Sequence, residues 1–147
     1  MANTEPHTRI SQVGTVFVPV ADQDRALQFY LDRLGFEKRA DFPYGEGSRW
    51  VEVAPPGSAI AIALVPPSEG GTPGSDKTHC ALSTDDIDAA HAMLRAGGVD
   101  VDPEVAREGR ARHLLFDTDR DMGNATVPPM LFFRDIDRNR FLIVEAG

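Results

Sequence analysis

The sequence predicts an α+β fold built from two copies of one strand–helix–strand–strand–strand (βαβββ) unit. Two stretches that begin alike carry this prediction: Thr15-Val-Phe-Val-Pro-Val-Ala-Asp22 and His79-Cys-Ala-Leu-Ser-Thr-Asp-Asp86. Each reads as a short apolar strand, an acidic turn and an amphipathic helix that ends at glycine. Two such units packed side by side leave a shared concave surface, where we expect a ligand to sit.

The first unit is predicted over residues 10–67, after a loose tail at 1–9. Apolar residues over 11–20 indicate a largely buried strand. Asp22 or Asp24 can cap the next helix, whose apolar positions recur at helical spacing until Gly35 ends it. Three further strands are expected, separated by Gly- and Pro-rich turns, over 36–42, 49–54 and 59–65.

Residues 68–77 read as a linker, because proline and glycine dominate there and apolar residues are almost absent. The second unit, 78–147, completes what we expect to be one domain overall. Its predicted elements are a strand over 79–84, a helix over 87–96 capped by Asp85 or Asp86, a strand over 99–105, and a hairpin of 130–134 with 141–145. An insert at 107–127 interrupts this unit and reads either as a lid or as a surface excursion.

Composition excludes several function classes. The 147-residue chain carries a formal net charge of −8, which argues against nucleic acid as a partner. No apolar run approaches the roughly 18 residues of a membrane span, and the polar start does not resemble a signal peptide. Cys80 is the one cysteine, so no internal disulfide can form and we expect a cytoplasmic protein.

The order of these pieces resembles the vicinal-oxygen-chelate superfamily, which includes glyoxalase I, extradiol dioxygenases, fosfomycin-modifying enzymes and bleomycin-resistance proteins. The resemblance covers about residues 10 to 146, the insert excepted. It rests on Val20-Ala-Asp22 before Arg25-Ala-Leu-Gln-Phe-Tyr30, and on Leu94-Arg-Ala-Gly-Gly-Val99. The segment Phe133-Arg-Asp-Ile-Asp-Arg-Asn139 looks like the family's closing Asp-Pro-Asp-Gly-Asn turn, with Ile136 for proline and Arg138 for glycine.

The resemblance implies that each unit rolls its sheet into a half-barrel, and that the paired half-barrels enclose a shared cavity. Metal enzymes of the family place one ligand on each of four strands, where a divalent ion chelates two substrate oxygens. Carried onto this sequence, the four positions are Thr15, Ala63, His79 and Leu142. One imidazole among four does not hold a catalytic cation, so we expect no metal. Possible substitute ligands come from elsewhere in the chain: Glu52, Gln12 and His113.

Strand alternation, anchored on Thr15 and His79, divides the remaining side chains between the cavity and the core. A five-residue turn at 135–139 pairs Arg134 with Arg140 and Phe132 with Leu142. Val16, Val18, Val20, Cys80 and Leu82 then face the helices, as do Val51 and Val53. The predicted ligand-binding residues are Thr15, Phe17, Trp50, Glu52, Ala63, His79, Met130, Phe132, Arg134 and Leu142, with Ala81 and Ser83 on the same face.

Three of these residues bear on chemistry, and each has a structural alternative. Trp50 is either a stacking platform for a planar or cationic ligand or a core side chain. Glu52 is the one acid in an apolar strand, so it is a base, a counter-ion for a cationic ligand, or the partner of an arginine. His79 is a general base, a hydrogen-bond donor or a structural histidine. His79 and Glu52 are therefore the catalytic candidates if the protein is an enzyme.

The sequence thus favours a metal-independent protein of the bleomycin-resistance type that sequesters an aromatic or cationic small molecule, as a symmetric homodimer. The alternative is a metal-dependent lyase, isomerase or dioxygenase of the same superfamily with relocated ligands. A third hypothesis is a cavity-bearing domain whose ligand regulates a partner protein. Motifs for serine hydrolases, phosphate loops and dinucleotide binding are absent from the sequence.

Overall fold

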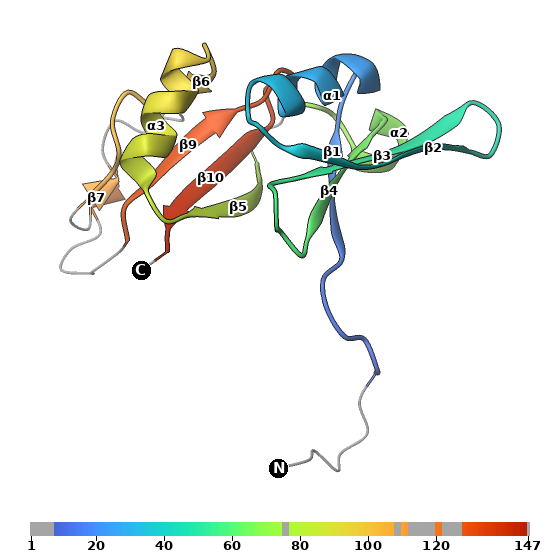
Figure 1. Cartoon of the computed structure of the whole chain (residues 1–147), viewed down its shortest axis with the longest axis horizontal. Helices are drawn as coiled ribbons and strands as arrows, with labels where there is room; N and C mark the ends of the chain where they lie inside the picture. Colours follow the sequence, from blue (N-terminus) through green and yellow to red (C-terminus); the bar gives the residue numbers. More distant parts are fainter. Residues whose placement is uncertain (1–7, 75–76, 108–109, 112–119, 122–127, 147) are drawn as a thin grey trace.

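The computed structural model describes residues 8–74, 77–107, 110–111, 120–121 and 128–146. Within them lie two four-stranded mixed sheets, each accompanied by one ten-residue helix (Figure 1). Sheet A has the order β1-β4-β3-β2, with β1 Thr15–Pro19, β2 Glu37–Tyr44, β3 Ser48–Ala54 and β4 Ala61–Val65. Sheet B has the order β5-β10-β9-β6, with β5 Thr78–Thr84, β6 Asp100–Val101, β9 Met130–Arg134 and β10 Arg140–Glu145.

The two helices confirm the internal repeat. Helix α1 spans Gln23–Asp32 and helix α3 spans Ile87–Ala96, so their bounds keep the offset that separates Thr15 from His79. Asp22 caps α1 by accepting a hydrogen bond from the Arg25 amide at 3.1 Å, and Asp86 caps α3 through the Ala89 amide at 3.0 Å. Of the alternative caps considered, Asp22 and Asp86 are therefore the ones used. Neither helix, nor any other in the described ranges, is long and apolar enough to cross a membrane.

Three expectations about individual elements were wrong. β1 is confined to five residues of the predicted 11–20, because residues 8–14 project from the body as an exposed arm (Figure 1). β6 contains only two residues of the predicted 99–105. At the next position the Phe132 amide donates to the Asp102 side chain instead of to a backbone carbonyl, and the strand pairing ends there. A short helix, α2 at Pro67–Gly70, begins where the linker was expected, with Pro67 at its first turn.

The 107–127 insert contains β7, Arg110–Ala111, paired with β8, Arg120–Asp121. Most of the insert lies outside the described residues, as does His113, and the choice between lid and surface excursion stays a prediction.

The face of each sheet that packs against the helices forms one continuous core. Val18, Val51 and Val53 are fully or almost fully buried, and Phe133 and Phe141 stack on sheet B with ring centroids 5.3 Å apart. These positions confirm the predicted alternation in β3 and the predicted register of the last hairpin, in which Arg134 pairs with Arg140 and Phe132 with Leu142. At about 1.5–3 kcal/mol for each large apolar side chain, this shared core is the main stabilising contribution.

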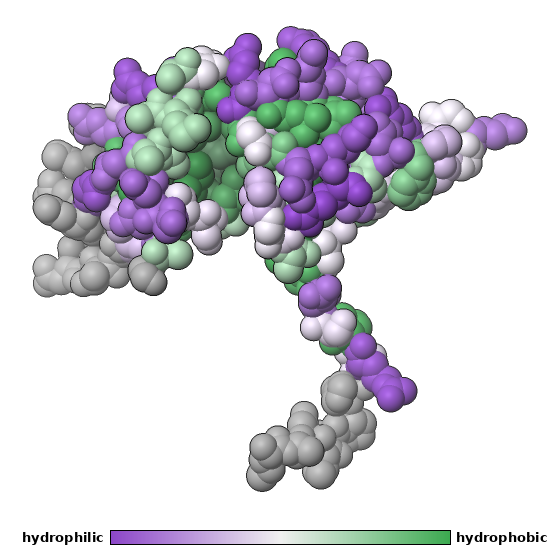
Figure 2. Space-filling view, viewed as in Figure 1, coloured by the Kyte–Doolittle hydropathy of each residue, from purple (hydrophilic) through white to green (hydrophobic). Residues whose placement is uncertain are grey.

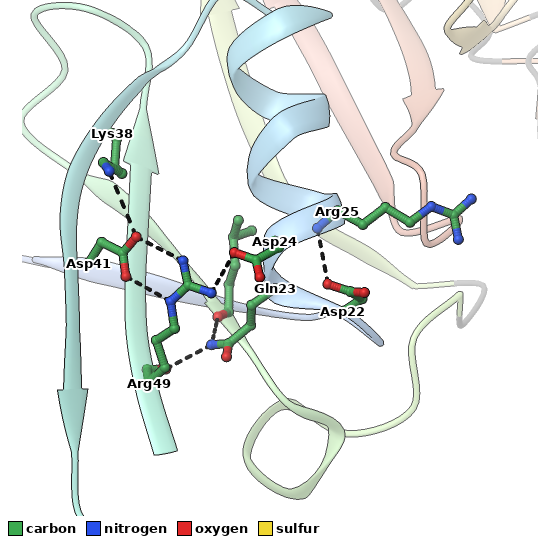
Figure 3. A network of polar contacts seen from close by, with 8 residues as sticks. Asp22, Gln23, Asp24, Arg25, Lys38, Asp41 and Arg49 are labelled. Carbon is green, nitrogen blue, oxygen red and sulfur yellow. Dashed lines mark hydrogen bonds and ion pairs between the residues drawn. The ribbon is translucent and has the colours of Figure 1, made fainter. Parts of the chain in front are cut away.

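Sheet A opens where β3 and β4 stop pairing, and Gln23 closes the opening. The paired residues end at Glu52↔Ala63, so the carbonyls of Arg49 and Leu64 lose their ladder partners. The Gln23 side-chain amide donates to both, at 2.7 and 2.8 Å (Figure 3). The first residue of α1 thereby supplies the hydrogen bonds that the diverging strands lack.

An ion-pair network lies beside Gln23 at the start of α1 (Figure 3). The Arg49 guanidinium binds both carboxylate oxygens of Asp41 at 2.8 Å and donates to Asp24 at 2.6 Å. Arg49 lowers the pKa of Asp41 mainly through these hydrogen bonds. Because the network is exposed, its contribution to stability is small, and its role is to fix the helix start against β2 and β3.

The turn between β9 and β10, residues 135–139, joins the two units; we call it the closing turn. Asp135 accepts hydrogen bonds from the Asp137 and Asn139 amides through one oxygen, at 2.9 and 2.8 Å. Its other oxygen accepts from the Tyr30 hydroxyl of α1 and from the Asn139 side-chain amide. Asp135 and Tyr30 are both buried, at 5 % and 0 % exposure, so this contact is a desolvated polar bond between units.

Asn139 extends the same junction to β1 and to the linker. Its side-chain amide donates to the Pro19 carbonyl at 2.8 Å, and its side-chain oxygen accepts from the Gly74 amide at 3.1 Å. Asp137 adds a bond from the Ala21 amide at 3.1 Å. Asn139 is completely buried, so hydrogen bonds within the protein, rather than water, satisfy the polar groups of its side chain and their partners at the junction.

Replacing Asn139 by alanine should lower the free energy of unfolding by about 2–4 kcal/mol, because it leaves several buried polar groups without partners. Urea denaturation followed by circular dichroism measures the change. Ser58→Ala in the equivalent turn of the first unit is the control, since that hydroxyl is bonded only within its own exposed turn. We expect this control to lose less than about 1 kcal/mol. Equal losses in the two variants would contradict the assigned role of the closing turn.

Arg138 adopts a positive φ of 67°, a conformation that costs a non-glycine residue about 1–2 kcal/mol. Glycine relieves that strain but adds about 0.5–1 kcal/mol of chain entropy to be lost on folding. Arg138→Gly should therefore raise the free energy of unfolding by about 0.5–1 kcal/mol in the same urea experiment. Arg138→Ala, which keeps the strain, should show no such gain; if it gains as much, the side chain rather than the backbone is responsible.

Candidate functional site

The face of sheet A that points away from the helices carries four aromatic side chains, which we call the aromatic face: Phe17, Phe42, Tyr44 and Trp50. The Trp50 ring lies edge-on to Phe17 and to Tyr44, with centroids 5.6 and 6.1 Å apart. Phe42 is the direct cross-strand partner of Trp50. Phe17 and Phe42 remain 47 % and 50 % exposed, so half of this apolar surface faces solvent in the single chain.

Glu52 lies beside the aromatic face. The Trp50 indole N–H donates to its carboxylate, and Glu52 pairs across the strands with Ala63, which in turn pairs with Phe17. Among the described residues Trp50 is the side chain that hydrogen-bonds Glu52, so of the alternatives for Glu52 the arginine ion pair is not the contact found. The structure thus brings a carboxylate, an indole and a phenyl ring together, with Thr15 one position further along the same face of β1.

The corresponding face of sheet B combines apolar and cationic side chains. Phe132 and Leu142 are direct cross-strand partners, and Arg134 pairs with Arg140 next to them. The Arg140 guanidinium lies over the Phe132 ring, 5.3 Å from its centroid, and donates to the Thr78 hydroxyl at 2.8 Å. Met130, a further predicted residue, pairs with Val144 and is half-buried on this face.

His79 does not follow the alternation that assigned it to the cavity. Arg140 pairs with Thr78 and Phe141 with Cys80, so His79 is an extra residue in β5 at an irregularity of the ladder. Its ring lies 6.3 Å from that of Phe141, which belongs to the core. Sequence alone could not reveal this irregularity, because it depends on how β10 leaves the closing turn.

The surroundings of His79 disfavour protonation of its ring. Burial lowers the pKa of His79, opposed by the nearby Asp135 carboxylate and the Asn139 side chain. Its Nε2 atom is buried and finds no hydrogen-bond partner in the described part of the chain. A neutral imidazole nitrogen can accept a proton, so His79 keeps the chemistry of a base at the edge of the unit junction.

Asp102 is a functional candidate that the sequence did not single out. It is completely buried, and one carboxylate oxygen accepts the Phe132 amide at 2.9 Å while its own amide donates to the Phe132 carbonyl at 3.0 Å. The other oxygen, Oδ1, has no partner in the ranges that the structure describes. Burial raises the pKa of Asp102 to about 7. The sequence did not distinguish Asp102, because the expected strand over 99–105 holds three acidic residues in alternation, Asp100, Asp102 and Glu104.

These residues do not fit a catalytic metal. The four ligand positions that the resemblance implies hold Thr15, Ala63, His79 and Leu142, of which one is an imidazole and two are aliphatic. Of the proposed substitutes, Gln12 lies in the exposed arm and Glu52 binds Trp50. Across the described ranges, no group of three or more His, Cys, Asp or Glu side chains is placed to hold an ion.

The raised pKa of Asp102 predicts how the free energy of unfolding depends on pH. The folded state holds the proton more tightly than the unfolded state, so this stabilisation is complete below about pH 4 and is lost as pH rises through about 7. Asp102→Asn cannot ionise. Relative to the parent protein it should gain about 2–4 kcal/mol of unfolding free energy between pH 4 and pH 8, as measured in urea.

A second variant, Asp102→Ser, cannot ionise either. It should show the same pH dependence as Asp102→Asn, whatever its absolute stability. Parallel stability curves for Asp102→Asn and the parent protein would show that Asp102 is already ionised in the folded state.

Comparison with known proteins agrees with this fold. The profile of the Glyoxalase/Bleomycin resistance protein/Dioxygenase superfamily matches residues 9–141. A superfamily member from Sphaerobacter thermophilus is 32 % identical, covers 95 % of this chain and 100 % of its own, and superimposes with a TM-score of 0.76. TnmS3, an antibiotic-binding protein from Streptomyces sp. CB03234, is 31 % identical over 96 % of this chain and 100 % of its own, with a TM-score of 0.71.

A curated relative comes from Bacillus subtilis. The uncharacterized protein YetH of strain 168 is 33 % identical over 91 residues, which are 62 % of this chain and 76 % of YetH. The profile match spans both β–α–β–β–β units, so the resemblance seen in the sequence is confirmed. The chain belongs to the Glyoxalase/Bleomycin resistance protein/Dioxygenase superfamily.

Proposed function

We propose that this protein is a metal-independent small-molecule-binding protein that holds an aromatic or cationic ligand against Trp50. The observation that carries the proposal is the half-exposed aromatic face beside the Glu52 carboxylate. An indole face attracts planar rings and cations, and a carboxylate in the same place adds charge to that attraction. Glu52 uses one oxygen to bind Trp50, which leaves the other for a ligand.

Two further considerations support binding rather than chelate chemistry. TnmS3, which is similar over nearly the whole chain, is an antibiotic-binding protein. The donor set at the family's ligand positions offers one imidazole, whereas a catalytic cation in proteins usually has three or more ligands. We therefore infer a ligand held by stacking and charge, in a protein that sequesters it in the cytoplasm.

We also propose that the binding unit is a homodimer. In the single chain the aromatic face is open, and Ala81 and Ser83 on β5 are exposed as well. β1 and β5 are the outer strands of their sheets and lie next to each other, so the two open faces border one another. A second copy laid over them would bury this apolar surface and enclose a ligand between subunits.

A lyase, isomerase or dioxygenase activity is the second candidate, and His79 is the observation that favours it. The buried Nε2 atom without a partner in the described ranges would suit a base or a relocated metal ligand. Elemental analysis of purified protein separates the two functions. Stoichiometric iron, zinc, manganese or nickel that disappears in His79→Ala would establish the enzyme and overturn the metal-independent binder.

Trp50 is the one tryptophan of the chain, so its fluorescence reports directly on the proposed site. Titration with a panel of planar aromatic antibiotics and cationic drugs should quench Trp50 and raise the melting temperature for a subset of them. Phe17→Ala should weaken binding of such a ligand about 2- to 10-fold, since one aromatic contact is worth about 0.5–1.5 kcal/mol.

Glu52→Gln tests the charge of the ligand. It should weaken cationic members of the panel while leaving neutral aromatic ones within about twofold. Val13→Ala, an exposed apolar residue of the arm, is the matched control for Phe17→Ala and should change nothing. If no compound in the panel affects Trp50 fluorescence or melting, a domain whose ligand regulates a partner protein is the better description.

A further inference from the structure

The internal repeat places two helices in equivalent positions but leaves their contacts with the opposite unit unequal. Tyr30 of α1 reaches the closing turn and is bonded to Asp135 there. At the offset of the repeat, the equivalent of Tyr30 on α3 is Leu94. The equivalent of the closing turn is the β3–β4 turn, which opens with Pro55. The polar pair that seals the first junction is therefore replaced by two apolar residues at the second.

A groove remains at this second junction; we call it the inter-unit groove. Its inner hollow has a volume of about 230 Å³ and is bordered by α3, the end of α1, β5 and Pro55. A second hollow of about 460 Å³ shares Pro55, Leu82 and Ser83 with the first and continues along β5 under the β3–β4 turn. Figure 2 shows hydrophobic atoms gathered in the depression between α3 and α1.

The inner hollow is large enough for a ring system. An apolar cavity of about 150 Å³ in another protein takes up benzene, so about 230 Å³ leaves room for a bicyclic aromatic. Its walls are mostly aliphatic and aromatic, with Phe36, Phe133 and Leu94 among them, while Met93 at the rim is 73 % exposed. Methionine adapts to differently shaped apolar ligands.

Arg33 is the charged residue among the described ones that line the two hollows. Its guanidinium donates to the Gly97 carbonyl at the end of α3 at 3.1 Å, which holds it at the rim. The hydroxyls of Ser83 and Thr84 add polar groups nearby. The protein has a net charge of −8, so a cationic side chain beside an apolar hollow is a local exception. It favours a ligand that joins an anionic group to an apolar ring system.

We propose that the inter-unit groove is a second ligand site, which binds an aromatic carboxylate with its rings between α3 and Pro55 and its carboxylate on Arg33. The inner hollow is distinct from the aromatic face, because Leu82 and Phe133 lie on the side of sheet B that faces the core, opposite to Phe132. The second hollow extends from it to Ala81 on the open face of β5. The site also differs in charge: the groove offers a cation, and the aromatic face offers Glu52. A ligand here contacts both units and therefore stabilises their placement.

Equilibrium dialysis with 2-naphthoate as the probe, and with uncharged 2-naphthamide beside it, tests the proposal on the full chain. Ala90→Phe fills the inner hollow and should weaken binding of both probes at least tenfold. Arg33→Gln should weaken 2-naphthoate about fivefold and leave 2-naphthamide within twofold. Met93→Glu changes an exposed side chain that the fold tolerates, and should weaken 2-naphthoate more than 2-naphthamide.

Matched controls separate a loss of binding in the inter-unit groove from misfolding and from effects at the aromatic face. Ala92→Phe lies on the exposed face of α3 and Arg25→Gln lies on α1, and both should leave 2-naphthoate binding unchanged. Phe17→Ala should leave it unchanged as well, whether or not the aromatic face binds its own ligand. Binding that survives both Ala90→Phe and Met93→Glu, or that is lost in Phe17→Ala, would overturn the proposal.

The oligomeric state supplies the last test. Sedimentation velocity of the parent protein and of Ala90→Phe should give the same mass, because the groove is proposed to hold a small molecule. A change of mass in that variant would show that a second copy of the chain covers the groove, and would overturn the assignment. Equal weakening of 2-naphthoate and 2-naphthamide in Arg33→Gln would overturn the assigned anionic class.

Discussion

The fold depends on the buried bond network of Asp135 and Asn139 in the closing turn. These two side chains join the end of β1, helix α1 and the linker residue Gly74, which belong to different parts of the sequence. Burial raises the pKa of Asp135, and the bonds from Tyr30 and Asn139 oppose this by stabilising its ionised form. A network that binds three segments at one buried point fixes the relative placement of the units more specifically than apolar contact alone.

The same network explains why a duplicated sequence does not give a symmetric molecule. The helices, their caps and the order of the strands are repeated faithfully, because these follow from local sequence. The junctions are not, because each depends on a pair of residues from different units, and the polar pair is present in one place only. Tyr30 and Asp135 close one side, whereas Leu94 and Pro55 leave the other side as a groove. One of the two equivalent junctions therefore remains an open groove, which is available to a ligand.

Sequence periodicity was sufficient to predict the features that depend on neighbouring residues in the sequence. The repeat, the caps at Asp22 and Asp86, the burial of Val51 and Val53, and the register of the last hairpin were all predictable. The contacts between distant strands were not. The irregularity that turns His79 toward Phe141, and the replacement of a backbone partner by Asp102, both depend on neighbours that lie far away in the sequence. For the candidate site, the sequence therefore predicted which face of each sheet carries the site residues, but it did not predict the position of His79.

The charges of the two sheet faces limit what a ligand between them can be. Sheet A contributes Glu52 next to Trp50, and sheet B contributes Arg134 and Arg140 next to Phe132. A ligand that spans both faces is best matched when its cationic or electron-poor ring lies on Trp50 and its acceptors point toward sheet B. A metal would need donors concentrated at one point, whereas here the polar groups are spread over two sheets and separated by rings. That distribution suits the proposed recognition of an extended aromatic molecule, for which stacking rather than coordination would supply the binding energy.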